Sequence, residues 1–217
     1  IGVDMGLWSK FMFPIGMDWI MGGPQFQAER EKSLVSAQGE VLELGFGTGL
    51  NLPHYPESVD SLYLVDPEVF LPRRVEKRIA AVRMPVRREA TSAEELPFEA
   101  DRFDCVVSTW TLCAISDLDS ALKEVVRVLK PEGKFIFLEH GRSDDVSVAR
   151  WQDRLNPIQR ICGCGCNMNR KIDTFICDAG LEIETIDRFL MPRLSASRGR
   201  CIVVLQGEQN EDSTAAA

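Results

Sequence analysis

The chain lacks the features that would point to a membrane or secreted protein. Residues 7–21 are rich in apolar side chains, but Lys10 and Asp18 interrupt them, and a helix needs ~20 apolar residues to cross a bilayer. No signal peptide is recognisable, and the seven cysteines are an odd number, which favours reduced thiols over a disulfide framework. We therefore expect a cytoplasmic protein, without membrane contact through its N-terminal segment.

Positive charge is also scarce. The chain has 25 lysines and arginines against 33 acidic residues, a formal net charge of −8 and a pI near 4.9. A nucleic acid is not an expected partner, because binding to its phosphates requires a basic surface. The sequence contains no internal repeat and no linker that would divide it, and 217 residues suit a single α/β domain.

What the chain does contain is a short apolar run that leads directly into a glycine-rich turn, residues 41–51. The run includes Glu43, and the turn carries Gly45, Gly47 and Gly49. Glycine lets the backbone turn sharply and approach a ligand closely, where a Cβ would clash. A strand followed by such a turn predicts a nucleotide-type cofactor at the carboxyl edge of an α/β sheet.

Strand and helix patterns alternate after this turn. A second strand, residues 61–65, ends in Asp66, and an acid ~20 residues beyond the glycine turn is where a ribose-binding carboxylate is expected. Residues 181–189 and 200–206 favour an antiparallel strand pair at the edge of the sheet. The other expected strands are 85–89, 103–109 and 133–139, and the expected helices are 25–37, 69–82, 118–129 and 172–179.

These patterns divide the chain into three segments. Residues 1–39 are expected to form a helical cover, and residues 40–206 form the cofactor domain. Within the domain, residues 142–170 fit the alternation less well and are interpreted as an insertion on the substrate side. Residues 207–217 are small and polar, which predicts a disordered tail.

The order of these elements, together with five motifs, resembles the class I S-adenosylmethionine-dependent methyltransferases. The resemblance implies an enzyme that uses S-adenosylmethionine and releases S-adenosylhomocysteine. It also implies a Rossmann-like fold, with a seven-stranded, mostly parallel sheet, an antiparallel edge strand and helices on both faces. The motifs are Glu43-Leu-Gly-Phe-Gly-Thr-Gly49, Asp66, Ala93-Glu-Glu-Leu-Pro-Phe98, Phe103-Asp-Cys-Val-Val107 and Arg127-Val-Leu-Lys-Pro-Glu-Gly133.

The same resemblance implies a set of cofactor contacts. Acidic Glu43 and Asp66 suit the positive charge of the methyl donor. Ser92 departs from the family pattern, because many relatives have an aspartate there that bonds the adenine amino group, so Thr91, Ser92 or Glu94 would supply this bond. The expected cofactor-binding residues are Glu43, Gly45, Phe46, Gly47, Thr48, Gly49, Asn51, Asp66, Pro67, Ser92, Ala93, Glu94, Thr109 and Trp110.

Within this family, the chain is more similar to the group that contains the microsomal alkyl-thiol methyltransferases. This similarity implies a small molecule as the methyl acceptor, most simply a thiol or a sulfide. The residues that carry it are Gly49-Leu-Asn-Leu-Pro53 with Tyr55-Pro56, Thr111-Leu-Cys-Ala114, Phe137-Leu-Glu-His140 and Gly165-Cys-Asn-Met-Asn-Arg170.

A thiol acceptor makes modest chemical demands on the protein. The thiolate is the nucleophile, and an ordinary thiol pKa of ~8.5 leaves a useful fraction ionised near neutrality. An oxygen or carbon acceptor would instead need a general base, for which His140, just beyond the fifth expected strand, is the candidate. A structural role for His140 is an equally good interpretation. Cys113, near the cofactor end of the sheet, is the second catalytic candidate.

Two segments provide candidates for acceptor binding. Aromatic and methionine side chains before the first strand suit adaptable contacts with an apolar acceptor, although a helix packed on the domain surface explains them equally well. The loop before residue 170 either lines the acceptor pocket or only anchors that part of the chain. The candidate residues are Trp8, Phe11, Trp19, Cys166, Asn169 and Arg170.

A cluster of three cysteines in this loop raises the question of a metal. Cys162, Cys164 and Cys166 could bind a soft metal or metalloid, but zinc sites usually pair two cysteines with a second pair elsewhere. We therefore predict no metal. The alternatives to thiol methylation are methylation of a lipophilic oxygen, nitrogen or carbon acceptor, such as a quinone precursor or a phospholipid headgroup, methylation of a metalloid, and a non-catalytic cofactor-binding role. The oligomeric state stays open.

Overall fold

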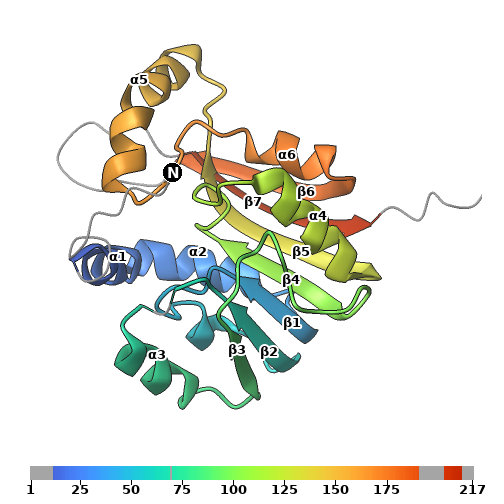
Figure 1. Ribbon diagram of the computed structural model, residues 1–217. Coiled ribbons are helices and arrows are strands. Elements are labelled where there is room, and N and C mark those ends of the chain that lie inside the picture. The colour runs from blue at the N-terminus through green and yellow to red at the C-terminus, as the bar shows by residue number, and fades with distance from the viewer. Residues whose placement is uncertain (1–11, 69, 191–202, 212–217) are drawn as a thin grey trace, which may run out of the picture.

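The computed structural model describes residues 12–68, 70–190 and 203–211. They form one seven-stranded sheet with helices on both faces (Figure 1). In spatial order the strands are β3 (Val86–Glu89), β2 (Val59–Val65), β1 (Gly39–Leu44), β4 (Phe103–Thr109), β5 (Leu129–Gly141), β7 (Val203–Glu211) and β6 (Leu181–Leu190). The helices are α1 (Phe13–Met21), α2 (Pro24–Leu34), α3 (Pro72–Ile79), α4 (Leu118–Val128), α5 (Val146–Cys162) and α6 (Ile172–Asp178), with a short helical turn η2 (Leu52–His54).

The pairing of the strands confirms the Rossmann-like fold. Strands β3, β2, β1, β4 and β5 pair in parallel, and β7 pairs antiparallel with both β5 and β6. One detail differs from the expectation, because the antiparallel strand β7 lies one place in from the edge, which β6 occupies. The position of β7 depends on backbone pairing between segments far apart in the sequence, so local patterns do not reveal it.

Side chains on β1 alternate between two apolar cores. Leu42 and Leu44 are fully buried on one face, in the cluster that includes Leu122 of α4. Val41 points to the opposite face, in the cluster that includes Val75 of α3. Because successive side chains of a strand point to opposite faces, a strand covered on both sides is apolar at nearly every position. This is why the central strands were predictable as short apolar runs.

The N-terminal segment packs against the sheet as two helices. Met21 of α1 and Phe26 of α2 are buried with Leu138 of β5, and Trp110 packs against this third cluster. The predicted helical cover is therefore present from residue 13 onward, whereas residues 1–11 lie outside the described residues. The cover reaches the end of β4, where Trp110 follows the last strand residue, and so it borders the edge at which a cofactor is expected.

Two features of the second half of the chain were not predicted from the sequence. Residues 146–162 form a regular helix, α5, although Pro157 lies inside it. The carboxylate of Asp145 starts this helix by accepting the backbone N–H of Ser147 at 2.7 Å, which is an N-cap. Residues 207–211 of the expected disordered tail belong to β7, because backbone pairing with β5 and β6 does not depend on apolar side chains.

The basic helix after β2 is shorter than expected. It was predicted over residues 69–82 and is found as α3, Pro72–Ile79. Leu71 precedes it with a φ of 44°, in the left-handed region, and Pro72 then takes the first helical position, where its missing N–H is not needed. Among the described helices, none combines the length and the apolar character that a membrane span needs.

Candidate cofactor and acceptor site

The glycine turn after β1 has the backbone conformation that its sequence predicts. Gly45, Gly47 and Gly49 have φ values of 65°, 52° and 78°, a region that side chains with a Cβ rarely adopt. A Cβ on Gly45 would lie 2.2 Å from Cγ2 of Thr111, which follows β4. The turn therefore passes so close to the β4 loop that glycine is required at position 45.

Asp66 at the end of β2 is bound to this turn. One carboxylate oxygen accepts the backbone N–H of Gly47 at 3.0 Å, and the other accepts the N–H of Glu68 at 3.0 Å. The side chain is buried, and burial raises the pKa of its carboxyl group against the opposing effect of these two bonds. The carboxyl ends of β1 and β2 are thus joined through an acid at the position expected for a ribose-binding carboxylate.

Glu43 and Asn51 form the centre of a buried polar network. The carboxylate of Glu43 accepts Nδ2 of Asn51 at 2.9 Å and the hydroxyl of Tyr55 at 2.7 Å. Oδ1 of Asn51 accepts Nε of Arg30 at 3.0 Å, and its amide also bonds Thr109. Burial raises the pKa of Glu43 to about 7 and lowers the pKa of Arg30 to about 10. The network fixes the turn between α2, β1 and β4, and the amide of Asn51 is fully engaged in it.

The remaining residues expected at the cofactor divide by their surroundings. The side chain of Phe46 is buried in the apolar core, so only its backbone is available to a ligand. The carbonyl of Thr48 accepts Nη1 of Arg78 at 2.7 Å. Pro67 is exposed beside Asp66. These three positions border the turn, and their predicted contacts with the cofactor stay predictions.

The segment after β3 carries the residues expected beside the adenine ring. The hydroxyl of Ser92 accepts the backbone N–H of Glu94 at 3.4 Å, which bends the chain. Ala93 is buried, and the carboxylate of Glu94 accepts the backbone N–H of Asp117 at 3.4 Å. The hydroxyl and carboxylate therefore stabilise the segment, and the predicted adenine contact stays a prediction.

Trp110 follows β4 with a φ of 58°, which is unusual for a residue with a large side chain. Its ring meets the ring of Phe26 edge-on, with centroids 5.7 Å apart, and stacks against His140 at 6.4 Å. The indole is held between the helical cover and the end of β5. It forms an apolar wall between the glycine turn and the second group of site residues.

That second group consists of Cys113, His140 and Cys166. Nε2 of His140 lies 3.0 Å from Sγ of Cys166, and the three side chains place one ligand atom each within 4.8 Å of the others. A hydrogen bond from the thiol of Cys113, supported by His140 and opposed by burial, lowers the pKa of Cys166. Burial alone would lower the pKa of His140, but the bond to Cys166 raises it. The contact thus shifts the pKa of Cys166 down and the pKa of His140 up.

Glu139, which precedes His140, is a functional candidate that the sequence analysis did not single out. It is fully buried, and its Oε1 accepts the backbone N–H groups of Thr111 at 2.6 Å and Leu112 at 2.8 Å. Burial raises the pKa of this carboxyl group to about 7. Glu139 positions the loop after β4, and its place in the quoted motif that ends at His140 was the available signal.

The loop after α5 is fixed against the end of β4. Nη1 of Arg170 donates to the carbonyl of Leu112 at 2.6 Å, and the backbone N–H of Asn167 donates to the carbonyl of Cys113 at 2.9 Å. The amide of Asn169 donates to Asp153 of α5 at 2.9 Å. Of the two interpretations given to Arg170 and Asn169, anchoring of the loop is therefore the one that the contacts favour. The anchored loop holds Cys166 beside His140.

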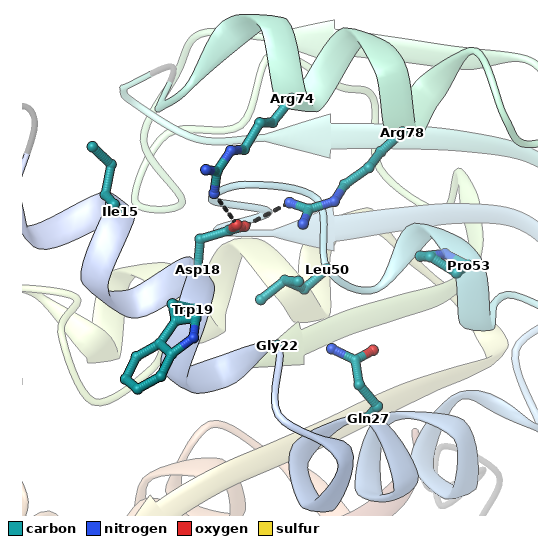
Figure 2. Close-up of a pocket in the computed structure, with 9 residues that line it drawn as sticks. All are labelled: Ile15, Asp18, Trp19, Gly22, Gln27, Leu50, Pro53, Arg74 and Arg78. Atoms are coloured by element: carbon teal, nitrogen blue, oxygen red, sulfur yellow. Dashed lines mark hydrogen bonds and ion pairs between the residues drawn. The ribbon is translucent and has the colours of Figure 1, made fainter.

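A pocket of about 550 Å³ lies between α1, α3 and the segment that follows the glycine turn. Figure 2 shows Arg74 and Arg78 of α3 reaching the buried carboxylate of Asp18 on α1. Trp19 lines the pocket and is 80% exposed, and the predicted acceptor contact stays a prediction. The other two expected aromatic residues, Trp8 and Phe11, lie outside the described residues.

The three-cysteine run does not act as a unit in the structure. Cys162 and Cys164 are exposed, whereas Cys166 is partly buried beside Cys113 and His140. The absence of a bound metal therefore stays a prediction. The side chains that are close enough together to hold a metal ion are Cys113, His140 and Cys166, and not the three cysteines of the run. Sequence spacing could not reveal this cluster, because its members come from three separate elements.

Comparison with known proteins agrees with the fold. Residues 42–137 match the family described as "Methyltransferase domain". Human thiol S-methyltransferase TMT1A is 34% identical over 140 residues, which cover 63% of this chain and 57% of that protein. Thiol S-methyltransferase TMT1B of Rattus norvegicus is 36% identical over 146 residues, 64% of this chain and 59% of that protein. The chain thus spans somewhat more than half the length of these relatives.

A solved structure with the same fold carries a ligand of the expected type. It is the 1,6-didemethyltoxoflavin-N1-methyltransferase of Burkholderia thailandensis, crystallised with 1,6-didemethyltoxoflavin and S-adenosylhomocysteine. The TM-score is 0.68 at 17% identity, and the match covers 95% of this chain and 88% of that one. Together with the sheet order and the glycine turn, this likeness shows that the chain has the fold of that methyltransferase, and the segment 42–137 is similar to the methyltransferase domain family and to thiol S-methyltransferases.

Proposed function

We propose that this protein transfers the methyl group of S-adenosylmethionine to the sulfur of a small thiol. The observation that carries the proposal is the 3.0 Å contact between Nε2 of His140 and Sγ of Cys166. An oxygen or carbon acceptor needs a protein base, and His140 is the best candidate for one. Because its imidazole is engaged with Cys166, the site favours an acceptor that attacks as a thiolate. The names of two relatives, both thiol S-methyltransferases, support the same acceptor.

The residues of the glycine turn fit the cofactor. A Cβ on Gly47 would meet no atom within 4 Å, so the turn is open there, and the buried carboxylate of Asp66 lies directly beside it. We propose that Asp66 binds the ribose hydroxyls and that Glu43 supplies negative charge near the methionine end. When bound, the cofactor supplies an electrophilic methyl group on a sulfonium centre. The protein's part is to bind, orient and exclude water.

The transfer is a single displacement at carbon. The acceptor sulfur, already deprotonated, forms the new S–C bond as the bond from the methyl carbon to the sulfonium sulfur breaks. Trp110, held between Phe26 and His140, supports the acceptor side as an apolar wall. The acceptor sulfur must lie ~3 Å from the methyl carbon, in line with the leaving sulfur.

The test uses the purified full chain with S-adenosylmethionine and a panel of small alkyl and aryl thiols, with products identified by mass spectrometry. We expect S-methylated thiols. The variant Asp66→Ala should lose cofactor binding in calorimetry and turnover together. Asp60→Ala, on the same strand but exposed, is the matched control and should keep both. Turnover on phenols or quinone precursors without any thiol product would contradict the proposal.

A lipophilic acceptor methylated on oxygen is the second candidate, because Ile15, Trp19 and Leu50 line the 550 Å³ pocket. Phenols with long alkyl chains should be included in the panel for this reason. Tight cofactor binding with no turnover on any acceptor would instead indicate a non-catalytic binding protein.

A further inference from the structure

Cys113, His140 and Cys166 converge at the carboxyl ends of β4 and β5 from three different elements. Cys113 follows β4, His140 is near the end of β5, and Cys166 lies in the loop after α5. One ligand atom from each lies within 4.8 Å of the other two, and the pair His140 Nε2 and Cys166 Sγ is 3.0 Å apart. Cys113 is 2% exposed and Cys166 is partly buried, so this is a built cluster and not a surface coincidence.

Two thiolates and one imidazole are a donor set that suits zinc. Zn–S bonds of about 2.3 Å and Zn–N bonds of about 2.0–2.1 Å place tetrahedral ligand atoms roughly 3.5–3.8 Å apart. The three atoms in this cluster lie within 4.8 Å of one another, so no pair has to move by more than about an ångström to reach that spacing. Nε2 of His140 and Sγ of Cys166 would separate by about half an ångström from their 3.0 Å contact, which a small rotation of either side chain allows.

We propose that Cys113, His140 and Cys166 form a three-ligand zinc site whose fourth position is open to the sulfur of the acceptor thiol. Zinc sites with four protein ligands are structural, whereas those with three keep a position for water or substrate. The part of the proposal that concerns the acceptor rests on the proposed thiol methylation. The part that concerns the metal rests only on the three side chains.

Neighbouring residues hold these ligands in place as the surroundings of a metal site require. Nε2 of Gln159 lies 3.5 Å from Sγ of Cys166, and Trp110 stacks on His140. Asn167 donates its side-chain amide to the carbonyl of Cys113 at 3.2 Å, which couples the loop to the turn after β4. Partners of this kind fix the orientation of metal ligands and tune the metal.

A zinc ion here would give the enzyme its nucleophile. A thiol that coordinates zinc loses its proton, so the acceptor is held as a thiolate at neutral pH and the proton passes to solvent. The sulfur then forms its bond to the methyl carbon while the bond from that carbon to the sulfonium sulfur breaks. The product is a neutral thioether, a weaker ligand than the thiolate, so water can displace it from the fourth position.

The same loop supplies the matched control for this proposal. Cys162 and Cys164 lie only a few residues from Cys166, but both are exposed and outside the cluster. A double variant, Cys162→Ser with Cys164→Ser, removes two thiols without touching the proposed ligands. A protein that binds zinc through the three-cysteine run would lose zinc binding in this double variant, whereas the proposed site would keep it.

The metal is tested first, on reduced full-length chain. We expect about one zinc per chain by elemental analysis. After chelation, Co²⁺ should bind and produce thiolate-to-metal charge-transfer absorption. Loss of a residue that hydrogen-bonds a metal ligand lowers metal affinity about 10–100-fold. Loss of a ligand itself should lower the affinity for Co²⁺ by more than this, and we expect such a loss in each of the variants Cys113→Ser, Cys166→Ser and His140→Gln. The double variant Cys162→Ser with Cys164→Ser should bind as the unaltered chain does.

Two measurements keep these results interpretable. Circular dichroism and cofactor calorimetry must show that each ligand variant is folded. Addition of an acceptor thiol should shift the d–d absorption of the Co²⁺ protein, whereas addition of the methylated thioether should not. A folded chain that binds neither zinc nor Co²⁺, or that loses binding in the Cys162 and Cys164 double variant alone, would overturn the proposal.

Activity separates this proposal from the proposed function. If metal-free protein methylates thiols at the full rate, zinc does not hold the acceptor, and that part of the proposal is wrong while thiol methylation stands. If the three ligand residues bind Co²⁺ but no thiol is methylated or shifts the spectrum, the thiol acceptor is wrong and the metal site stands.

Discussion

Arg78 of α3 joins Asp18 of α1 at 2.6 Å and, through the same nitrogen, the carbonyl oxygen of Thr48 at 2.7 Å. This guanidinium links the helical cover directly to the glycine turn. Arg74 also binds Asp18, so two cations hold one buried carboxylate (Figure 2). The cover is therefore fixed where it borders the cofactor turn, and its stability and cofactor binding should be coupled.

Asp18→Asn should loosen this link. Removing one partner from a buried, hydrogen-bonded charge pair costs about 1–3 kcal/mol, and we expect a loss of unfolding free energy in that range. Cofactor affinity should fall as well, because Arg78 would no longer be held against Thr48. Urea unfolding and calorimetry measure the two effects. Glu57→Gln, which removes the almost fully exposed ion pair with Arg83, is the control and should change neither.

Gly45→Ala should abolish cofactor binding. The new Cβ would lie 2.2 Å from Cγ2 of Thr111 and would also have to adopt a φ of 65°, which costs roughly 1–2 kcal/mol by itself. We expect a lower melting temperature and no heat of binding with S-adenosylmethionine. Gly16→Ala in α1, where a Cβ would meet no atom within 4 Å, should be neutral or slightly stabilising. Equal effects of the two substitutions would contradict the close approach.

Glu43→Gln should change how stability depends on pH. The pKa of about 7 lies above the ordinary value of 4.5, so the folded chain binds this proton more tightly than the unfolded chain. The stabilisation is fully present below about pH 4.5 and is lost as pH rises through about 7. The unfolding free energy of the unaltered protein should therefore fall by up to about 3 kcal/mol over this pH window. In the variant, the pH-dependent contribution of Glu43 to this free energy is missing. Urea unfolding of both proteins from about pH 5 to about pH 8 measures the difference, and parallel curves would contradict it.

Leu71→Gly should stabilise the chain. Leu71 has a φ of 44° immediately before α3, a conformation that glycine adopts without strain. Relief of this strain is expected to add up to about 1 kcal/mol, reduced by the greater entropy of glycine in the unfolded chain. Asp101→Gly, at a φ of 53°, is the comparison and should gain less, because aspartate tolerates this region better than leucine does. A loss of stability in Leu71→Gly larger than in Asp101→Gly would argue against strain at this position.

Local patterns were sufficient for the part of the molecule that depends on near neighbours. Strand β4 was predicted with its observed bounds, Phe103–Thr109, because a buried parallel strand carries a short apolar run such as Cys105–Val107. The turn with Gly45 was predictable because positive φ requires glycine. Helix α5 was missed, since Pro157 counts against a helix in any local pattern, whereas the Asp145 cap and the buried Gln152 outweigh it.

The sequence by itself determined the fold class and the glycine turn, because both rest on backbone preferences and apolar periodicity within short segments. Only the tertiary structure decided that Asn51 is a buried network residue and that β7 enters the sheet inside its edge. It also separated Cys166 from Cys162 and Cys164 and placed it with Cys113 and His140. The reason is that neighbouring parallel strands such as β4 and β5 have their carboxyl ends at the same edge of the sheet. Residues that are far apart in the chain come together at this edge only when the sheet has formed.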